Sequence, residues 1–235
     1  MLTYKNDPKF KEQFTPIVTQ HRKDDMVLQG TYGTQNGHWK GCAVACSLRS
    51  LDILNGKEPK TEYTSHSRFE KDGLWPEWLA HLEDRIFEGL PQEEALLWPE
   101  KVAKAVPVGV DLTRVKWQFS AFLLKENIER VLSLDISDTL KEQVVSAIRQ
   151  VLAVHTSAIR TGEWDESAAS AAWSAASAAW SAAWSAARSA AWSAARSAAW
   201  SAKSAAESAE SAASAASAAY SRYAKKLLQL LREVK

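Results

Sequence analysis

The sequence has few of the residues that cross-link a chain or break its helices, and neither sign of charge dominates. Two Cys exclude a disulfide scaffold and a four-cysteine zinc module. Nine Gly and seven Pro are too few for a turn-rich β fold. With 29 Lys and Arg against 28 Asp and Glu, the composition argues against a basic nucleic-acid binder and against an acidic solvating chain. No apolar run follows Met1, so we expect no secretory signal and a cytoplasmic protein.

Glycine and proline are missing altogether from the C-terminal part of the chain. All of them fall within 1–162, and none occurs from Glu163 to Lys235. Residues 167–219 instead contain 28 Ala, 15 Ser and 5 Trp. Alanine has the highest helix propensity, and nothing in this segment breaks a helix. We therefore predict two domains, a mostly helical globular body over 1–162 and a long Ala/Ser/Trp-repeat helix over 163–235.

The serines of the repeat define its period. From Ser167 to Ser221, fifteen steps cover 54 residues, a mean of 3.6, which is the α-helical repeat. Acidic residues precede the repeat and basic residues follow it, which complements a helix dipole. The sequence therefore predicts one unbroken helix. Its end would either clamp an oligomer or dock back on the body through four leucines, Leu227, Leu228, Leu230 and Leu231.

The body shows helical rather than alternating hydrophobic patterns. Pro76 and Pro91 suit first helical positions, and Ser137 or Asp138 suits an N-cap. Loops are expected around 28–41 and 56–75. The predicted fold class is therefore all-α, with body helices at 10–21, 42–54, 76–87, 91–105, 111–134 and 137–160.

Four segments carry a resemblance to a group of uncharacterised proteins from phages and bacteria. They are GTYGTQNGHWKGCAVACSL at 30–48, HSRFEKDGLWPEWLAHLEDRIFEGLP at 66–91, VPVGVDLTRVKWQF and the SAAxSAA tail. The group shares a GCAVGC-like motif and an Ala/Ser tail of variable length. This chain departs from the pattern at Ala45, where the group has Gly, and in the length of the 50–65 connection. The resemblance implies a phage or prophage accessory protein and supplies no catalytic residue, because no activity is established for the group.

Cys42 is the residue with the strongest case for chemistry. It is expected to open a helix, where a thiol has a lowered pKa that favours a reactive thiolate. His66 or His38 would then act as a base, and Glu70 as the acid that orients it. The interpretation we favour is that Cys42 and Cys46 are small buried residues, spaced i, i+4 on a core helix.

A metal site is a third interpretation of the same segment. His38, Cys42 and Cys46, with His66 in addition, offer imidazole and thiolate ligands. However, the C-x3-C spacing is not that of a zinc knuckle, and no fourth ligand is evident. We therefore predict no metal and no cofactor.

The repeat allows several roles. Small side chains let helices approach closely, which favours self-association or a protein partner with Trp as anchors. Alternating Trp and Arg suit single-stranded nucleic acid, but 8 basic against 6 acidic residues over 163–235 give little attraction for phosphate. Adsorption to a membrane surface and a simple spacer are weaker alternatives, because the segment is too polar to span a bilayer. The predicted interaction residues are Trp173, Trp180, Trp184, Arg188, Trp192, Arg196 and Trp200.

These patterns favour a non-enzymatic assembly or partner-binding protein of phage or bacterial type. It would act as a homo-oligomer or with a protein partner through its C-terminal helix. The alternative is a cysteine-dependent enzyme with Cys42 as the nucleophile.

Overall fold

The computed structural model describes residues 1–34, 38–172, 174 and 202–235, with side chains in the last stretch from 215 onward. Throughout this part of the chain the regular structure is helical and no strand forms. Among the residues described, extended segments meet only in isolated bridges, Val27 with Gly41 and Thr34 with Lys40. The all-α prediction is confirmed. None of the helices described is long and apolar enough to cross a membrane.

Two compact units make up the chain. One contains 1–112 together with 213–235, and the other contains 113–212. The composition change at 162 falls inside the second unit, where Gly162 ends a helix in the left-handed conformation at φ 81°. The boundaries between the two units therefore do not coincide with the change in composition at 162.

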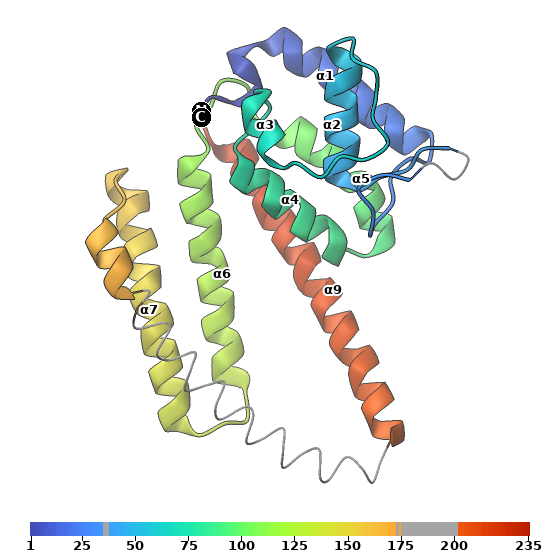
Figure 1. Cartoon of the computed structure of the whole chain (residues 1–235). Coiled ribbons are helices and arrows are strands. Elements are labelled where there is room, and N and C mark those ends of the chain that lie inside the picture. Colours follow the sequence, from blue (N-terminus) through green and yellow to red (C-terminus); the bar gives the residue numbers. More distant parts are fainter. Residues whose placement is uncertain (35–37, 173, 175–201) are drawn as a thin grey trace. The chain divides into compact units, whose positions relative to one another are not determined.

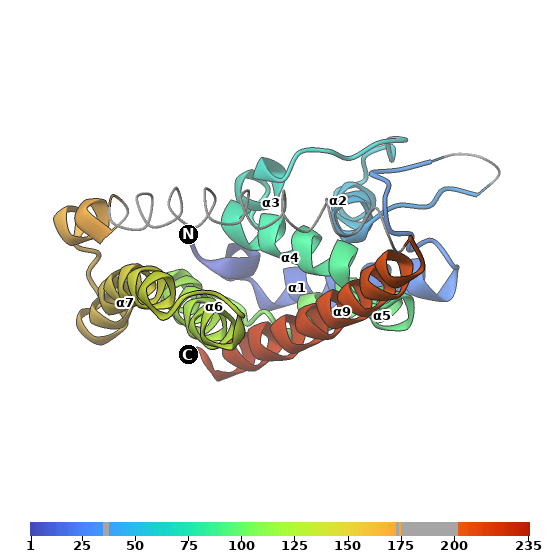
Figure 2. The same ribbon diagram turned by 90° about the horizontal axis from the view of Figure 1, so that it is seen from below.

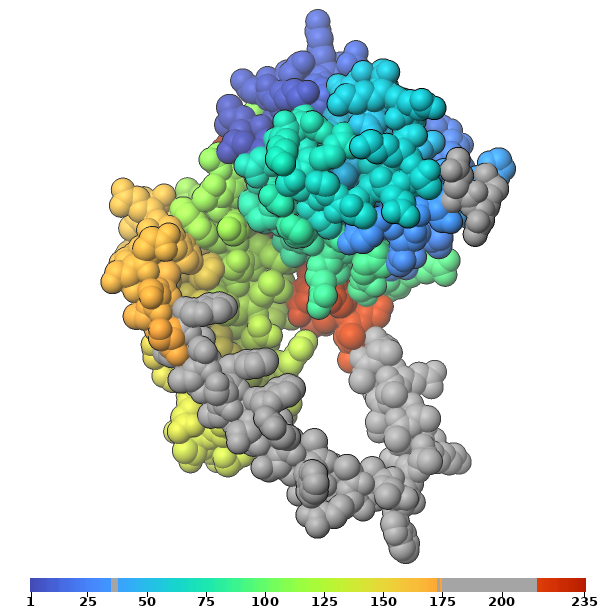
Figure 3. All heavy atoms as spheres, in the orientation of Figure 1, coloured from blue at the N-terminus to red at the C-terminus, as the bar shows by residue number. Residues whose placement is uncertain are grey.

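The first unit packs its helices around an aromatic core. Tyr4, Phe14, Phe69, Trp75 and Trp98 are all fully buried there. Helix α1 packs on α2 and α5, and α4 packs on α2 and α3. Figure 3 shows the residues of α2 to α4, in cyan to green, closed into one continuous surface. The elements of this unit (Figure 1) are η1 (Thr3–Asn6), α1 (Pro8–Lys23), α2 (Ala43–Leu54), α3 (Ser67–Lys71), α4 (Glu77–Gly89) and α5 (Gln92–Ala105).

Most of the body helices lie where the sequence predicts them, and two short elements do not. The 3-10 turn η1 and the five-residue helix α3 fall in segments without a readable period. Elements this short offer too few residues for a hydrophobic repeat. The segment expected as a loop at 56–75 therefore contains α3.

The last helix, α9 (Ala202–Glu233), ends against the first unit. Leu227 and Leu231 are fully buried, and Ser221 donates a hydrogen bond of 2.7 Å to the Glu94 carboxylate at the start of α5. Figure 2 shows α9, in red, running beside α5. Of the two predicted roles of this leucine-rich end, docking on the body is the one observed.

The second unit contains a helical hairpin. Helices α6 (Thr113–Ser133) and α7 (Asp138–Thr161) pack against each other, and Ser137 caps α7 through the Leu140 amide at 3.4 Å. Residues 166–172 begin a further helix. The central part of the repeat, 175–201, lies outside the residues described, and so does the predicted continuity of its helix.

Candidate functional site

At the N-terminus of α2 the backbone passes so close to neighbouring side chains that only a glycine fits there. Cys42 is the N-cap of α2, and Gly41 precedes it. A Cβ at Gly41 would lie 2.8 Å from the Trp39 ring and 2.7 Å from Ala45 Cβ. Because both neighbours are buried, a side chain at Gly41 would push the loop away from the helix. The Gly-Cys pair thus seats Cys42 against the core.

Backbone hydrogen bonds hold the preceding loop over this helix end. The Cys42 amide donates to the Thr31 carbonyl at 2.7 Å, and the Leu28 amide donates to the Gly41 carbonyl at 2.9 Å. These bonds place Gly30 and Tyr32 beside α4.

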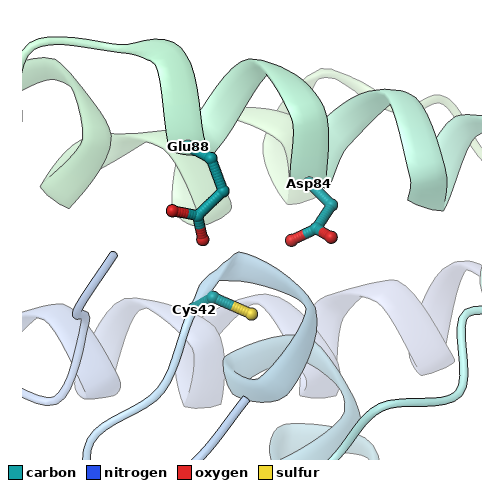
Figure 4. A group of neighbouring side chains, drawn as sticks. All are labelled: Cys42, Asp84 and Glu88. Carbon is teal, nitrogen blue, oxygen red and sulfur yellow. The ribbon is translucent and has the colours of Figure 1, made fainter. Parts of the chain in front are cut away.

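Helix α4 brings two carboxylates to the same place. Asp84 and Glu88 are spaced i, i+4 and share one face of the helix. Figure 4 shows both carboxylates directed at the Cys42 thiol from the facing helix. The ligand atoms of Cys42, Asp84 and Glu88 all lie within 4.8 Å of one another. Cys42 is 1% exposed, whereas Glu88 is exposed, so the cluster opens to solvent on the Glu88 side.

Hydrogen bonds occupy one oxygen of each carboxylate. Asp84 Oδ2 accepts from the Tyr32 hydroxyl at 3.0 Å and bonds His66 Nε2 at 3.0 Å. Glu88 Oε2 accepts from the Gly30 amide at 2.8 Å. Asp84 Oδ1 is buried without a hydrogen-bond partner. The outer oxygens are thus anchored, and Asp84 keeps a second oxygen without a protein donor.

The lowered pKa that the alternative interpretation predicts for the Cys42 thiol is wrong for this arrangement. Burial raises the pKa of Cys42 to about 12, and the negative charges of Asp84 and Glu88 add to the shift. The amides of Ala45 and Val44 at the helix end lower the pKa, as the sequence suggests, but their effect is smaller. Burial outweighs the helix terminus, and the two carboxylates oppose it as well, because a thiolate there is both desolvated and repelled. Burial likewise raises the pKa of Tyr32 to about 12, together with its hydrogen bond to Asp84.

His66 lies beside the cluster, but its partner is not the predicted one. It bonds Asp84 and stacks on His81 with ring centroids 4.0 Å apart. Glu70 instead accepts a hydrogen bond from the Glu77 amide at 3.1 Å, at the start of α4. Asp84 therefore occupies the orienting position that the sequence assigned to Glu70.

The other predicted metal ligands do not join this group. Cys46 is fully buried, and its thiol donates to the Gly41 carbonyl at 3.4 Å. His38 is exposed beside a stretch that the structure does not describe. Cys46 thus fits the interpretation of a small core residue, whereas Cys42 is both a core residue and part of a polar cluster.

The predicted interaction residues of the repeat cannot be placed. All of them lie outside the residues described: Trp173, Trp180, Trp184, Arg188, Trp192, Arg196 and Trp200.

No family model, curated protein or solved structure matches the chain. The phage or prophage setting therefore stays a prediction from the resemblance of its motifs.

Sequence reasoning missed Asp84, Glu88 and Tyr32. The i, i+4 spacing of the two acids on an amphipathic helix was a readable signal. Acidic residues on one face are typical of any exposed helix, however, and only the approach of α2 distinguishes this pair.

Proposed function

We propose that the chain is a metal-binding protein in which Cys42, Asp84 and Glu88 hold one divalent ion of the zinc class. The observation that carries the proposal is the convergence of a thiol and two carboxylates from two packed helices, with every pair of ligand atoms within 4.8 Å. Asp84 Oδ1, buried and without a hydrogen-bond partner, supports it. A cation between these groups would satisfy that oxygen.

The electrostatics of the cluster favour a cation. Without one, Asp84 and Glu88 raise the pKa of Cys42, and burial raises the pKa of Glu88, with Asp84 adding to the shift. A divalent ion reverses this relation, because a coordinating thiol is deprotonated by the metal. The negative groups that repel one another without a metal would thus all be attracted to the bound cation.

The donor set and its spacing select the class of metal. A thiolate ligand favours zinc-like ions over magnesium or calcium. Zinc bonds of ~2.3 Å to sulfur and ~2.1 Å to oxygen separate neighbouring ligand atoms by about 3.5 Å. Side-chain rotations of Asp84 and Glu88 would therefore close the cluster without moving either helix.

The surroundings of the cluster match those of a metal site. The hydrogen bonds from Tyr32, His66 and the Gly30 amide hold the carboxylates from outside, the role that second-shell groups play in metal proteins. Three protein ligands leave one position of a tetrahedral ion free. With Glu88 exposed, that position would admit water or a small ligand.

The test is a cobalt titration of the full chain after treatment with a chelator. We expect one Co²⁺ per chain and a thiolate-to-cobalt charge-transfer band, which Zn²⁺ abolishes by displacement. Cys42→Ser should lose the band, whereas Cys46→Ala, the matched change at the other cysteine, should keep it. Asp84→Asn should weaken affinity at least tenfold, and Glu70→Gln should leave it unchanged. Circular dichroism confirms that each variant is folded.

Two outcomes would overturn the proposal. One is the absence of stoichiometric cobalt binding by the folded wild-type chain. The other is a charge-transfer band that survives in Cys42→Ser and disappears in Cys46→Ala.

A second proposed function is assembly through a long Ala/Ser/Trp helix. What supports it is the 3.6-residue period of the serines, together with helical conformation at 166–172 and from Ala202 onward. We propose that Trp side chains spaced along this small-residue surface anchor a second copy or a protein partner.

Point substitutions test assembly better than truncation at 162. That truncation would also remove Leu227 and Leu231, which are buried against the first unit. Light scattering should therefore compare the full chain with a variant in which Trp180, Trp184, Trp192 and Trp200 are alanine. An oligomeric wild type and a monomeric variant support the proposal, and equal masses reject self-association.

A further inference from the structure

A pocket between α1 and α2 lies apart from the cysteine cluster. Its volume is about 400 Å³, enough for a small organic molecule. Ile17 of α1, Met26 of the following loop and Ile53 of α2 form its apolar lining. His21 and Arg49 are two of the polar side chains that line it, and they add hydrogen-bonding groups to the apolar wall.

His21 is a buried polar side chain whose ring nitrogens lack a hydrogen bond of normal geometry. It is 3% exposed, and the Cys46 backbone has only the smallest effect on its pKa. Unpartnered buried polar groups are uncommon and costly, so this one needs an explanation. Burial, reinforced by the charge of Arg49, lowers the pKa of His21 to about 4, against smaller opposing effects of Asp24 and the Cys46 backbone. The imidazole is therefore neutral near pH 7 and keeps one N–H to donate.

Arg49 brings a fixed positive charge to the same pocket. Its guanidinium lies over the Trp39 ring at 4.6 Å and donates to the Lys60 carbonyl at 3.2 Å. The His21 ring lies 5.7 Å from the same indole. Trp39 thus positions a cation and a neutral hydrogen-bond donor on one wall. An exposed acid at the rim, Asp24, accepts from Gln20 at 2.8 Å.

We propose that this pocket binds a small organic acid with a hydrocarbon body. Its carboxylate would bond Arg49 and His21, and its hydrocarbon would contact Ile17, Met26 and Ile53. A guanidinium presents paired donors that match a carboxylate, and the imidazole N–H adds a third. This ligand would satisfy the buried donor of His21 and the charge of Arg49 together.

The test uses octanoate and 1-octanol as a matched pair of probes. They share a hydrocarbon chain and differ in the carboxylate. Titrations of the full chain are followed by NMR of the His21 imidazole and by calorimetry. We expect octanoate to shift the His21 ring signals and to bind at least tenfold more tightly than 1-octanol. Arg49→Gln should weaken octanoate at least tenfold, whereas Lys57→Gln, which removes an exposed charge nearby, should not.

The wild-type comparison keeps the proposal falsifiable even if Arg49→Gln fails to fold. Equal affinities for the acid and the alcohol would overturn it, because the carboxylate would then contribute nothing. So would His21 signals that no acid shifts, since the ring would then be satisfied by water alone. Octanoate binding that Arg49→Gln leaves unchanged in a folded variant would also overturn it.

Discussion

At the scale of single residues, neighbours decide the behaviour of each titratable group more than local sequence does. Cys42 sits at a helix N-terminus, yet its pKa rises, because burial and two carboxylates act together. The pKa of His21 falls instead, because burial and the charge of Arg49 both disfavour the protonated imidazole. In both cases the controlling charges come from residues distant in sequence, which no local motif reveals.

The buried imidazole of His21 predicts acid sensitivity of the fold. Its folded pKa of about 4 lies below the ordinary value of 6.5, so the unfolded chain binds the proton more tightly. The stability due to neutral His21 is complete above pH 6.5 and is lost as the pH falls toward 4. The full loss is about 3 kcal/mol, at ~1.36 kcal/mol per pKa unit.

Urea unfolding of wild type and His21→Leu between pH 7.5 and pH 4 checks this prediction. The wild type should lose more stability than His21→Leu over that interval. His38→Gln, at an exposed histidine, should follow the wild type. Parallel pH profiles for wild type and His21→Leu would show that His21 does not titrate as the structure implies.

At the scale of elements, the contact between α4 and α9 depends on one glycine. A Cβ at Gly89 would lie 2.2 Å from the Tyr220 ring. Gly89→Ala should therefore destabilise the chain by about 1–3 kcal/mol, the usual effect of overpacking a close contact. Tyr220→Ala in the same chain should recover part of that loss. Urea denaturation of the two single variants and the double variant measures the coupling, and additive effects would contradict the contact.

The leucines of α9 should behave as core residues. Leu231 is fully buried, so Leu231→Ala should cost about 2–5 kcal/mol of folding free energy. Lys225, an exposed residue on the same helix, provides the control, and Lys225→Ala should change stability by less than about 0.5 kcal/mol. Thermal unfolding of both variants tests the difference. Similar midpoints for the two would show that this end of α9 is not docked.

The same elements show which parts of the fold can be predicted from the sequence and which cannot. Periodicity and capping place the long helices, including the Ser137 cap of α7, because these signals lie within one element. The cluster of Cys42, Asp84 and Glu88 depends on α2 packing against α4, a pairing that no single segment encodes. The docking of Leu227 could not be predicted from its own segment either. The same apolar stripe would serve equally to hold an oligomer together or to dock on the body.

At the scale of the whole molecule, the chain leaves its first compact unit at residue 112 and returns to it at 213. The C-terminal segment is thus a structural part of a unit whose other residues lie far away in sequence. This topology gives the repeat two fixed ends, because both neighbouring segments belong to folded parts. It also means that the body is incomplete when the chain is cut at 162.

Cleavage within the repeat should therefore leave the fragments associated. A protease recognition sequence inserted after Ser189, then cut, should give two pieces that elute together in size-exclusion chromatography at micromolar concentration. The buried leucines supply the attraction, at ~1.5–3 kcal/mol for each fully buried side chain. With Leu227→Ala and Leu231→Ala combined, the C-terminal piece should elute alone, whereas Lys225→Ala should leave it bound. Separation of the pieces without these substitutions would show that the contact depends on the covalent tether.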